Sequence, residues 1–213
     1  PDIAFGSNQI FVIVGPHSEP DVQLGKPRPI YGQMLDLSGV KLSADPILIR
    51  TDGGAEPRYP QVASNGTSFV VSWIQGEQGS SSVNDGFYGI FAKVINSDGS
   101  FEPGVTAADG TEILPEIEED REFLELAWDG DNYIAVWGVI GYAETSGVWG
   151  TRFSADISTI RQAEPVWGAA TGGGSAAGPE PTQIALSIGD PFTLVFWTGG
   201  ATVKGWFLDA EFP

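Results

Sequence analysis

Short apolar runs rich in Val, Ile, Phe, Tyr and Trp recur along the chain, and each is bounded by Gly, Asn, Asp or Pro. This composition and length predict β-strands. In the run FVVSW, which ends at Trp73, the first, third and fifth side chains fall on one face and the other two on the opposite face. Both faces are largely apolar, so we expect these strands to be covered on both sides. No window keeps a helical period, and we expect no α-helix longer than a turn or two.

The apolar runs form a unit that occurs four times. Its first half is an apolar pair, a short turn and an aromatic-rich run, and it reads IAFGSNQIFVIV, VASNGTSFVVSW, LAWDGDNYIAVW and IALSIGDPFTLVFW. Its second half is a smaller apolar run that begins at Ile30, Ile90, Val148 and Val203. A period of about 55–60 residues is typical of repeat architectures. Equivalent positions, such as those of Trp73, Trp137 and Trp197, are best explained by packing between neighbouring units.

Turns and weaker runs complete each unit. Asn65-Gly66 and Asp129-Gly130 lie between paired runs, where a hairpin turn requires positive φ. A fourth, weaker run follows in three units, at residues 46–50, 112–114 and 165–167. Four antiparallel strands repeated radially make a β-propeller.

We therefore predict an all-β fold, a β-propeller of four four-stranded antiparallel blades that forms a single domain over residues 1–213. The last repeat lacks a clear fourth run, which leaves open a three-stranded blade, a larger ring or a strand supplied by a partner. The repeats span about 1–55, 56–114, 123–168 and 179–213.

The long connections should share one end of the blades. In such a meander, the first–second and third–fourth turns lie at one end, and the second–third loops and blade connections lie at the other. Loops on a rigid scaffold commonly carry binding sites. The long connections are 15–29, 51–57, 75–87, 138–147 and 169–178, and their candidate ligand-binding residues are Tyr142, Phe87, Tyr88, Glu77, Asp85 and Glu144.

The charge limits the class of partner. Ten Lys and Arg stand against 28 Asp and Glu, which gives a net charge of −18. This balance argues against nucleic acid and against anionic membrane surfaces. No apolar stretch is long enough to insert into a membrane. The absence of cysteine excludes disulfides, thiolate zinc sites and cysteine nucleophiles.

Few residues point to chemistry. His17 is the only histidine and no GxSxG motif occurs, so a Ser-His-Asp catalytic triad is not expected. Asp129 and Asp131 have the DxD spacing of part of a calcium loop, although a hairpin turn also explains them. Calcium is therefore the only cofactor that we consider. A pair of carboxylates stays open, and its candidates on the long connections are Glu19, Asp21, Glu56, Glu77, Asp85 and Glu144.

The pattern A-x-(N/D)-G-x-x-(F/Y)-V-V-x-W, followed by G-(I/V)-(Y/F/W)-(A/G), resembles the repeat of bacterial secreted and cell-surface β-propeller proteins. It is clearest in VASNGTSFVVSW and LAWDGDNYIAVW, whereas the first repeat has Val14 in place of the Trp and the fourth has a longer turn. The resemblance covers nearly the whole chain and implies an exported, extracellular or cell-surface scaffold. It carries no catalytic residues, and fold does not fix function.

The leading prediction is therefore a non-enzymatic interaction module. It would bind a protein or a glycan through the long-loop face, with self-association through the incomplete last blade as a further option. The alternative is a glycan-active hydrolase that uses a carboxylate pair at the mouth of the propeller channel.

Overall fold

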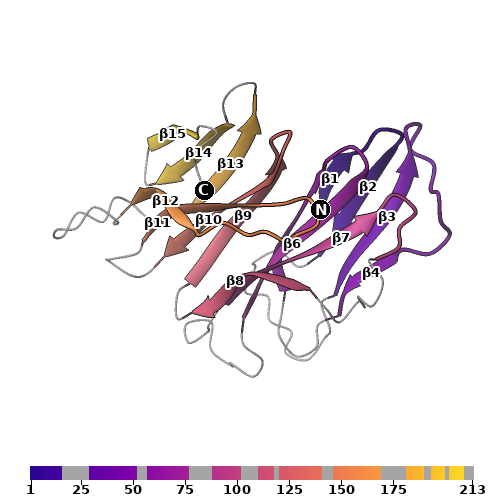
Figure 1. Cartoon of the computed structure of the whole chain (residues 1–213), viewed down its shortest axis with the longest axis horizontal. Helices are drawn as coiled ribbons and strands as arrows, with labels where there is room; N and C mark the ends of the chain where they lie inside the picture. Colours follow the sequence, from indigo (N-terminus) through magenta and orange to yellow (C-terminus); the bar gives the residue numbers. More distant parts are fainter. Residues whose placement is uncertain are drawn as a thin grey trace. The chain divides into compact units, whose positions relative to one another are not determined.

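The structure is a computed structural model, and its described residues fall into two compact units, Pro1–Glu116 and Ile117–Pro213. Within the described residues the chain consists of strands and turns, with no helix (Figure 1). The described residues are 1–15, 29–51, 57–76, 88–101, 110–117, 120–140, 146–168, 181–189, 193–199 and 202–208.

The first unit contains two four-stranded sheets, each formed by one repeat. The first sheet has the order β1-β2-β3-β4 and the second the order β5-β6-β7-β8. The strands of the first sheet are β1 (Asp2–Phe5), β2 (Gln9–Val14), β3 (Ile30–Asp36) and β4 (Ile47–Arg50). Those of the second are β5 (Pro57–Ser64), β6 (Ser68–Gly76), β7 (Tyr88–Asn96) and β8 (Thr111–Ile117).

The second unit contains the third and fourth repeats. The third sheet is formed by β9 (Asp120–Trp128), β10 (Tyr133–Ile140), β11 (Gly147–Phe153) and β12 (Glu164–Gly168). The fourth sheet has three described strands, β13 (Gln183–Ile188), β14 (Thr193–Gly199) and β15 (Thr202–Leu208). The predicted all-β class, with one antiparallel sheet for each repeat, is thus confirmed. The weak fourth runs are also confirmed as strands, because they fall in β4, β8 and β12.

The short turns follow from glycine and from side-chain acceptors. Gly66 and Gly130 have φ values of 91° and 110°, as the hairpins at Asn65-Gly66 and Asp129-Gly130 require. A second turn type follows the third strand in each of the first three sheets. Its fourth position has positive φ each time, at Gly39, Gly99 and Ile157.

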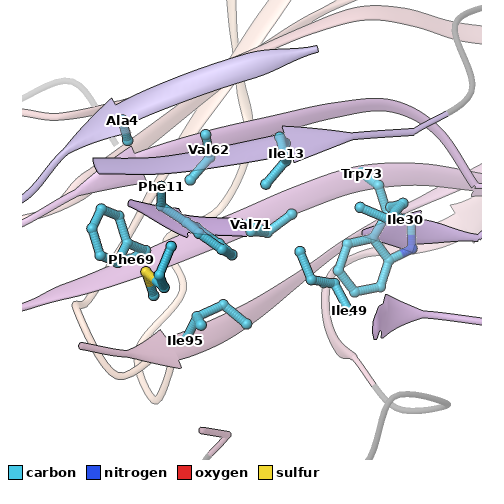
Figure 2. Packing of buried hydrophobic residues seen from close by; sticks show 11 residues of the cluster. Ala4, Phe11, Ile13, Ile30, Ile49, Val62, Phe69, Val71, Trp73 and Ile95 are labelled. Atoms are coloured by element: carbon cyan, nitrogen blue, oxygen red, sulfur yellow. The ribbon is translucent and has the colours of Figure 1, made fainter. Parts of the chain in front are cut away.

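The two faces of each sheet have different partners. We call the face that carries the Ala of the first strand the Ala face, and the opposite face, which carries Trp73 in the second sheet, the Trp face. In the first unit, the Ala face of the first sheet packs on the Trp face of the second (Figure 2). The Ala face supplies Ala4, Phe11, Ile13, Met34 and Ile49, and the Trp face supplies Val62, Phe69, Val71, Trp73 and Ile95.

The second unit repeats this contact. Ile134, Val136 and Val148 on the Ala face of the third sheet pack with Ile184, Val195 and Trp197 on the Trp face of the fourth. The predicted packing between neighbouring repeats is therefore confirmed for Trp73 and Trp197. One contact, Ala face on Trp face, accounts for the core of both units.

A β-bulge lies opposite the Trp in two repeats. Tyr59 and Pro60 face Trp73, and Phe123 and Leu124 face Trp137 in the same way. Tyr59 and Phe123 have φ values of 49° and 57°, which are costly for aromatic residues. No local sequence pattern indicates this bulge, because it depends on the register between strands.

Polar side chains tie the sheets of the first unit together. One carboxylate oxygen of Asp2 accepts a hydrogen bond of 2.8 Å from the backbone N–H of Val62. The ammonium group of Lys93, which is 2% exposed, donates to the carbonyl oxygen of Ile49 at 2.7 Å and lies 4.7 Å from the centre of the Phe101 ring. Because a buried cation needs such partners, these contacts fix how the two sheets pair.

The close approach at Gly32 gives a stability test. A Cβ atom there would overlap the Phe11 ring and lie 2.9 Å from Cδ1 of Ile49. We expect Gly32→Ala to destabilise the chain by about 1–3 kcal/mol, because overpacking forces side chains off their rotamers. Urea unfolding measures the effect. Tyr31→Phe, on the opposite face, is the control and should change stability by less than about 0.5 kcal/mol; equal effects would contradict the packing.

Candidate functional site

Two adjacent hollows lie at the short-turn end of the first unit. The first, the carboxylate pocket, has a volume of about 340 Å³, and the second, the amide pocket, about 400 Å³. Ser97 lines both. The carboxylate pocket is lined by Met34, Leu42, Ser43, Asp45, Ile47, Ser97, Asp98 and Gly99, and the amide pocket by Ser7, Asn8, Gln9, Gly66, Thr67 and Ser97.

The carboxylate pocket brings together turns from two repeats. Asp45 precedes β4 in the first sheet, and Asp98 lies in the turn after β7 in the second. The segment before Asp45 is held by Gln33, whose amide nitrogen donates to the carbonyl and hydroxyl oxygens of Ser43 at 3.2 and 3.1 Å. Asp98 accepts the backbone N–H of Ser100 at 2.9 Å. Each carboxylate is thus carried by a turn with its own hydrogen bonds.

The amide pocket is built from interlocked hairpin turns. The backbone N–H and the hydroxyl of Ser7 both donate to the carbonyl oxygen of Gly66, at 3.1 and 2.7 Å. Gln9 donates from its amide nitrogen to the carbonyl oxygen of Ser97 at 2.8 Å, so the bond lies where the two pockets meet. The lining side chains are hydroxyls and amides without charge, which suits a neutral ligand with many hydroxyl groups.

Hydrogen bonds keep the Asp98 carboxylate ionised. The side chain of Ser100, and then its backbone N–H, lower the pKa of Asp98 below its usual value of 3.8. The pocket therefore contains a stable negative charge beside the apolar side chains of Met34, Leu42 and Ile47.

The predicted long-loop residues are mostly outside the described residues. This holds for Glu77, Asp85, Phe87, Tyr142 and Glu144. Tyr88 is described, and its side chain is 5% exposed. The guanidinium carbon of Arg58 lies 5.4 Å from the centre of the Tyr88 ring, and Nη1 of Arg58 donates to the Tyr88 hydroxyl at 3.4 Å. The Tyr88 ring is therefore part of the packed end of the second sheet.

The other carboxylates predicted on the long connections also have no described position. Glu19, Asp21 and Glu56, together with His17, lie outside the described residues.

The DxD turn is held by protein groups. Oδ1 of Asp129 accepts the backbone N–H groups of Asp131 and Asn132, at 3.0 and 2.7 Å. Oδ2 of Asp129 pairs with Nε of Arg152 at 3.1 Å, an ion pair rather than a well-aligned hydrogen bond. Among the described residues, no group of three or more His, Asp or Glu could hold a metal ion. Calcium binding stays a prediction.

The carboxylate pocket lies at the end of the strands opposite the long connections. No local pattern in the sequence indicates this pocket, because Asp45 and Asp98 come from different repeats and each is part of an ordinary turn. The only indication in the sequence is the repeat, since neighbouring repeats that pack in the same orientation place their equivalent turns side by side. No helix in the described part of the chain is long and apolar enough to span a membrane.

The chain is similar to known proteins in its fold but not in its sequence. No protein-family model matches the chain, and no curated protein is similar to it in sequence. The structure resembles that of a xylan β-1,4-xylosidase from Bacillus halodurans, with a TM-score of 0.54 and 9% identity, over 100% of this chain and 42% of that chain. This likeness concerns the fold alone, and it supports the β-propeller type.

Two further solved structures are similar at a lower level. An oligogalacturonate lyase in complex with manganese has a TM-score of 0.47 and 10% identity, over 86% of this chain and 48% of that chain. The Bacteroides ovatus protein GH43B of a xyloglucan PUL has a TM-score of 0.47 and 10% identity, over 99% and 40%. The chain thus spans less than half the length of each of these proteins.

One expectation is corrected by the comparison. We expected a chain that is not an enzyme, but the fold match that spans the whole chain is to a glycan-cleaving enzyme. That expectation rested on the single histidine, His17, and on the missing GxSxG motif. Hydrolysis of a glycosidic bond needs neither, because two carboxylates suffice and they carry no local motif.

A turn equivalent to that of Asp98 gives a pH test. In the second unit, Asp156 accepts the hydroxyls of Ser154 and Ser158 at 2.6 and 2.7 Å, and these bonds lower its pKa from 3.8 to about 2. Because the folded-state pKa is depressed, the stabilisation is present above pH 3.8 and is lost as the pH falls through about 2.

We therefore expect Asp156→Asn to lower the melting temperature at neutral pH, with a difference from the wild type that shrinks as the pH falls toward about 2. Thermal melts over this pH range measure it. Asp131→Asn, at another exposed turn carboxylate, is the control. A difference that does not depend on pH would show that the charge of Asp156 is not involved.

Proposed function

We propose that the chain is a glycan-active hydrolase built on a β-propeller-type array of four blades. The observation that carries this proposal is the fold likeness to the xylosidase, which covers the whole chain. The neutral, hydroxyl- and amide-lined amide pocket agrees with a glycan ligand. The acidic charge of the chain, −18, disfavours an anionic polysaccharide.

The carboxylate pocket supplies the two groups that the reaction needs. Asp98, which its serine partner keeps ionised, takes the proton from the attacking water. Asp45 donates a proton to the glycosidic oxygen as the bond to the anomeric carbon breaks. A bound glycan covers the wall formed by Met34, Leu42 and Ile47, which excludes water from the bond that breaks.

The amide pocket then holds the next sugar of the chain. Its side chains come from the β1–β2 and β5–β6 turns, which the Ser7–Gly66 hydrogen bonds fix to each other. Since the two pockets meet at Ser97, a glycan that fills both has the bond between its sugars near the carboxylates. The site thus acts on a chain of at least two sugars.

Hydrolysis assays test the proposal. Aryl β-xylosides and xylo-oligosaccharides are the first probes, with glucosides, arabinosides and galactosides as further arms. Asp45→Asn and Asp98→Asn should each lower kcat by about 10²–10⁴-fold, because each removes a group that moves a proton. Asp36→Asn is the matched control: Asp36 is a half-buried carboxylate at the end of β3 and outside both pockets, and the equivalent position of the second repeat is already Asn96.

A second set of variants separates the two possible locations. Glu77→Gln, Asp85→Asn and Glu144→Gln alter the carboxylates of the long connections and should leave kcat unchanged. If only these variants lose activity, the chemistry lies at the long connections and the carboxylate pocket is not the centre. If the wild type hydrolyses none of the glycans, the hydrolase proposal is wrong.

A further inference from the structure

The hydrogen bonds inside the amide pocket determine what its wall can offer a ligand. The hollow has a volume of about 400 Å³ and is lined by hydroxyls, amides and backbone groups without charge. A hydroxyl has one donor hydrogen and two acceptor lone pairs, and a carbonyl oxygen only accepts. A donor that is already engaged with the protein can bind a ligand only by giving up its partner, which is costly. The groups that stay available therefore define the class of ligand.

Ser7 has both of its donors engaged within the protein. Its backbone N–H and its hydroxyl donate to the carbonyl oxygen of Gly66, at 3.1 and 2.7 Å. Because a carbonyl oxygen cannot donate, the hydroxyl of Ser7 is the donor in this bond. The backbone N–H of Gly66 is also engaged, since it donates to the hydroxyl oxygen of Ser64 at 3.0 Å. The hydroxyl of Ser7 can therefore only accept from a ligand.

Thr67, on the neighbouring turn, is arranged in the same way. Its backbone N–H and its hydroxyl both donate to Oδ1 of Asn65, each at 2.9 Å. The backbone N–H of Ser68 donates to the same atom at 2.8 Å, which identifies it as the amide oxygen rather than the amide nitrogen of Asn65. The hydroxyl of Thr67 can therefore also only accept from a ligand.

The other polar side chains of the amide pocket do not reverse this balance. The amide nitrogen of Gln9 donates to the carbonyl oxygen of Ser97 at 2.8 Å, whereas its oxygen Oε1 is an acceptor with two lone pairs. The side chain of Asn8 and the hydroxyl of Ser97 can accept as well as donate. The wall of the amide pocket can therefore accept more hydrogen bonds from a ligand than it can donate.

The carboxylate pocket has the same bias. The backbone N–H groups of Leu42 and Gly99 are engaged with backbone carbonyl oxygens, at 3.0 and 2.9 Å. The hydroxyl of Ser43 donates to the carbonyl oxygen of Asp45 at 2.9 Å. An ionised carboxylate such as that of Asp98 can only accept. Apart from the proton that Asp45 transfers in the reaction, these groups accept from a ligand rather than donate to it.

We propose that the two pockets select glycans whose hydroxyl groups are free and reject sugars whose hydroxyls are esterified or etherified. This inference rests on the proposed function, because it takes the ligand to be a glycan. A free sugar hydroxyl can donate to the oxygens of Ser7, Thr67 and Gln9, whereas the oxygens of an acetyl ester or a methyl ether can only accept. A substituted sugar leaves these protein oxygens without a partner, which costs affinity. The substrate class is therefore an undecorated neutral glycan.

Sugars that carry fluorine in place of a hydroxyl test this proposal, because fluorine is close to a hydroxyl in size but cannot donate. The ligands are xylotriose and a series in which its hydroxyls are replaced one at a time. The protein is the whole chain with Asp45→Asn, which slows hydrolysis. Isothermal titration calorimetry should show that xylotriose binds and that at least two fluorinated forms bind about fivefold or more weakly, since each leaves an acceptor of the site unpaired.

A pair of threonine variants, each combined with Asp45→Asn, locates the effect. Thr67→Val removes an accepting oxygen from the amide pocket and should raise the dissociation constant of xylotriose by about threefold to tenfold. It should also reduce the penalty at one fluorinated position, because the donor lost from the sugar no longer has a partner there. Thr159→Val is the matched control: Thr159 is an exposed turn residue that lines neither pocket, and this variant should bind as Asp45→Asn alone does. Circular dichroism checks that each variant is folded, and Ser7→Ala is the second test of the pocket.

The outcomes separate this inference from the proposed function. The inference is overturned if xylotriose does not bind, if every fluorinated form binds as xylotriose does, or if both Thr67→Val and Ser7→Ala bind xylotriose unchanged. Equal hydrolysis of O-acetylated and free xylo-oligosaccharides by the wild type also overturns it, while the hydrolase proposal stands. If binding depends on the sugar donors but no glycan is hydrolysed, the hydrolase proposal is wrong and the ligand class stands.

Discussion

Packing of the Ala face of one sheet on the Trp face of the next is the contact on which the rest of this structure depends. A single antiparallel sheet with two apolar faces is not stable in water, because it leaves both faces exposed. In each unit, this contact buries one face of each of two sheets. Phe11 and Trp73 are among the largest fully buried side chains of this contact. The turns at the ends of the strands are positioned by this contact.

The carboxylate pocket illustrates that dependence. Asp45 and Asp98 belong to turns that their own repeats would form in isolation, and each turn has its own hydrogen bonds. They meet only because the first two sheets stack face to face. Polar contacts such as Gln9 to Ser97 and Asp2 to Val62 then fix one sheet against the other. A site assembled in this way has rigid walls, which catalysis by positioned carboxylates requires.

The sequence by itself determined the strands, their repeat and the turns. These depend on local rules: apolar alternation in runs such as FVVSW, and glycine at positive φ in Asn65-Gly66. Only the tertiary structure decided which face meets which, where the bulge opposite Trp73 falls, and that Asp45 and Asp98 share a pocket. The physical reason is that these features arise from register and packing between segments far apart in the chain, and no local pattern encodes them. For the same reason, the prediction that the chain is not an enzyme was wrong. Enzyme chemistry here would need two carboxylates that are distant in the sequence rather than a motif.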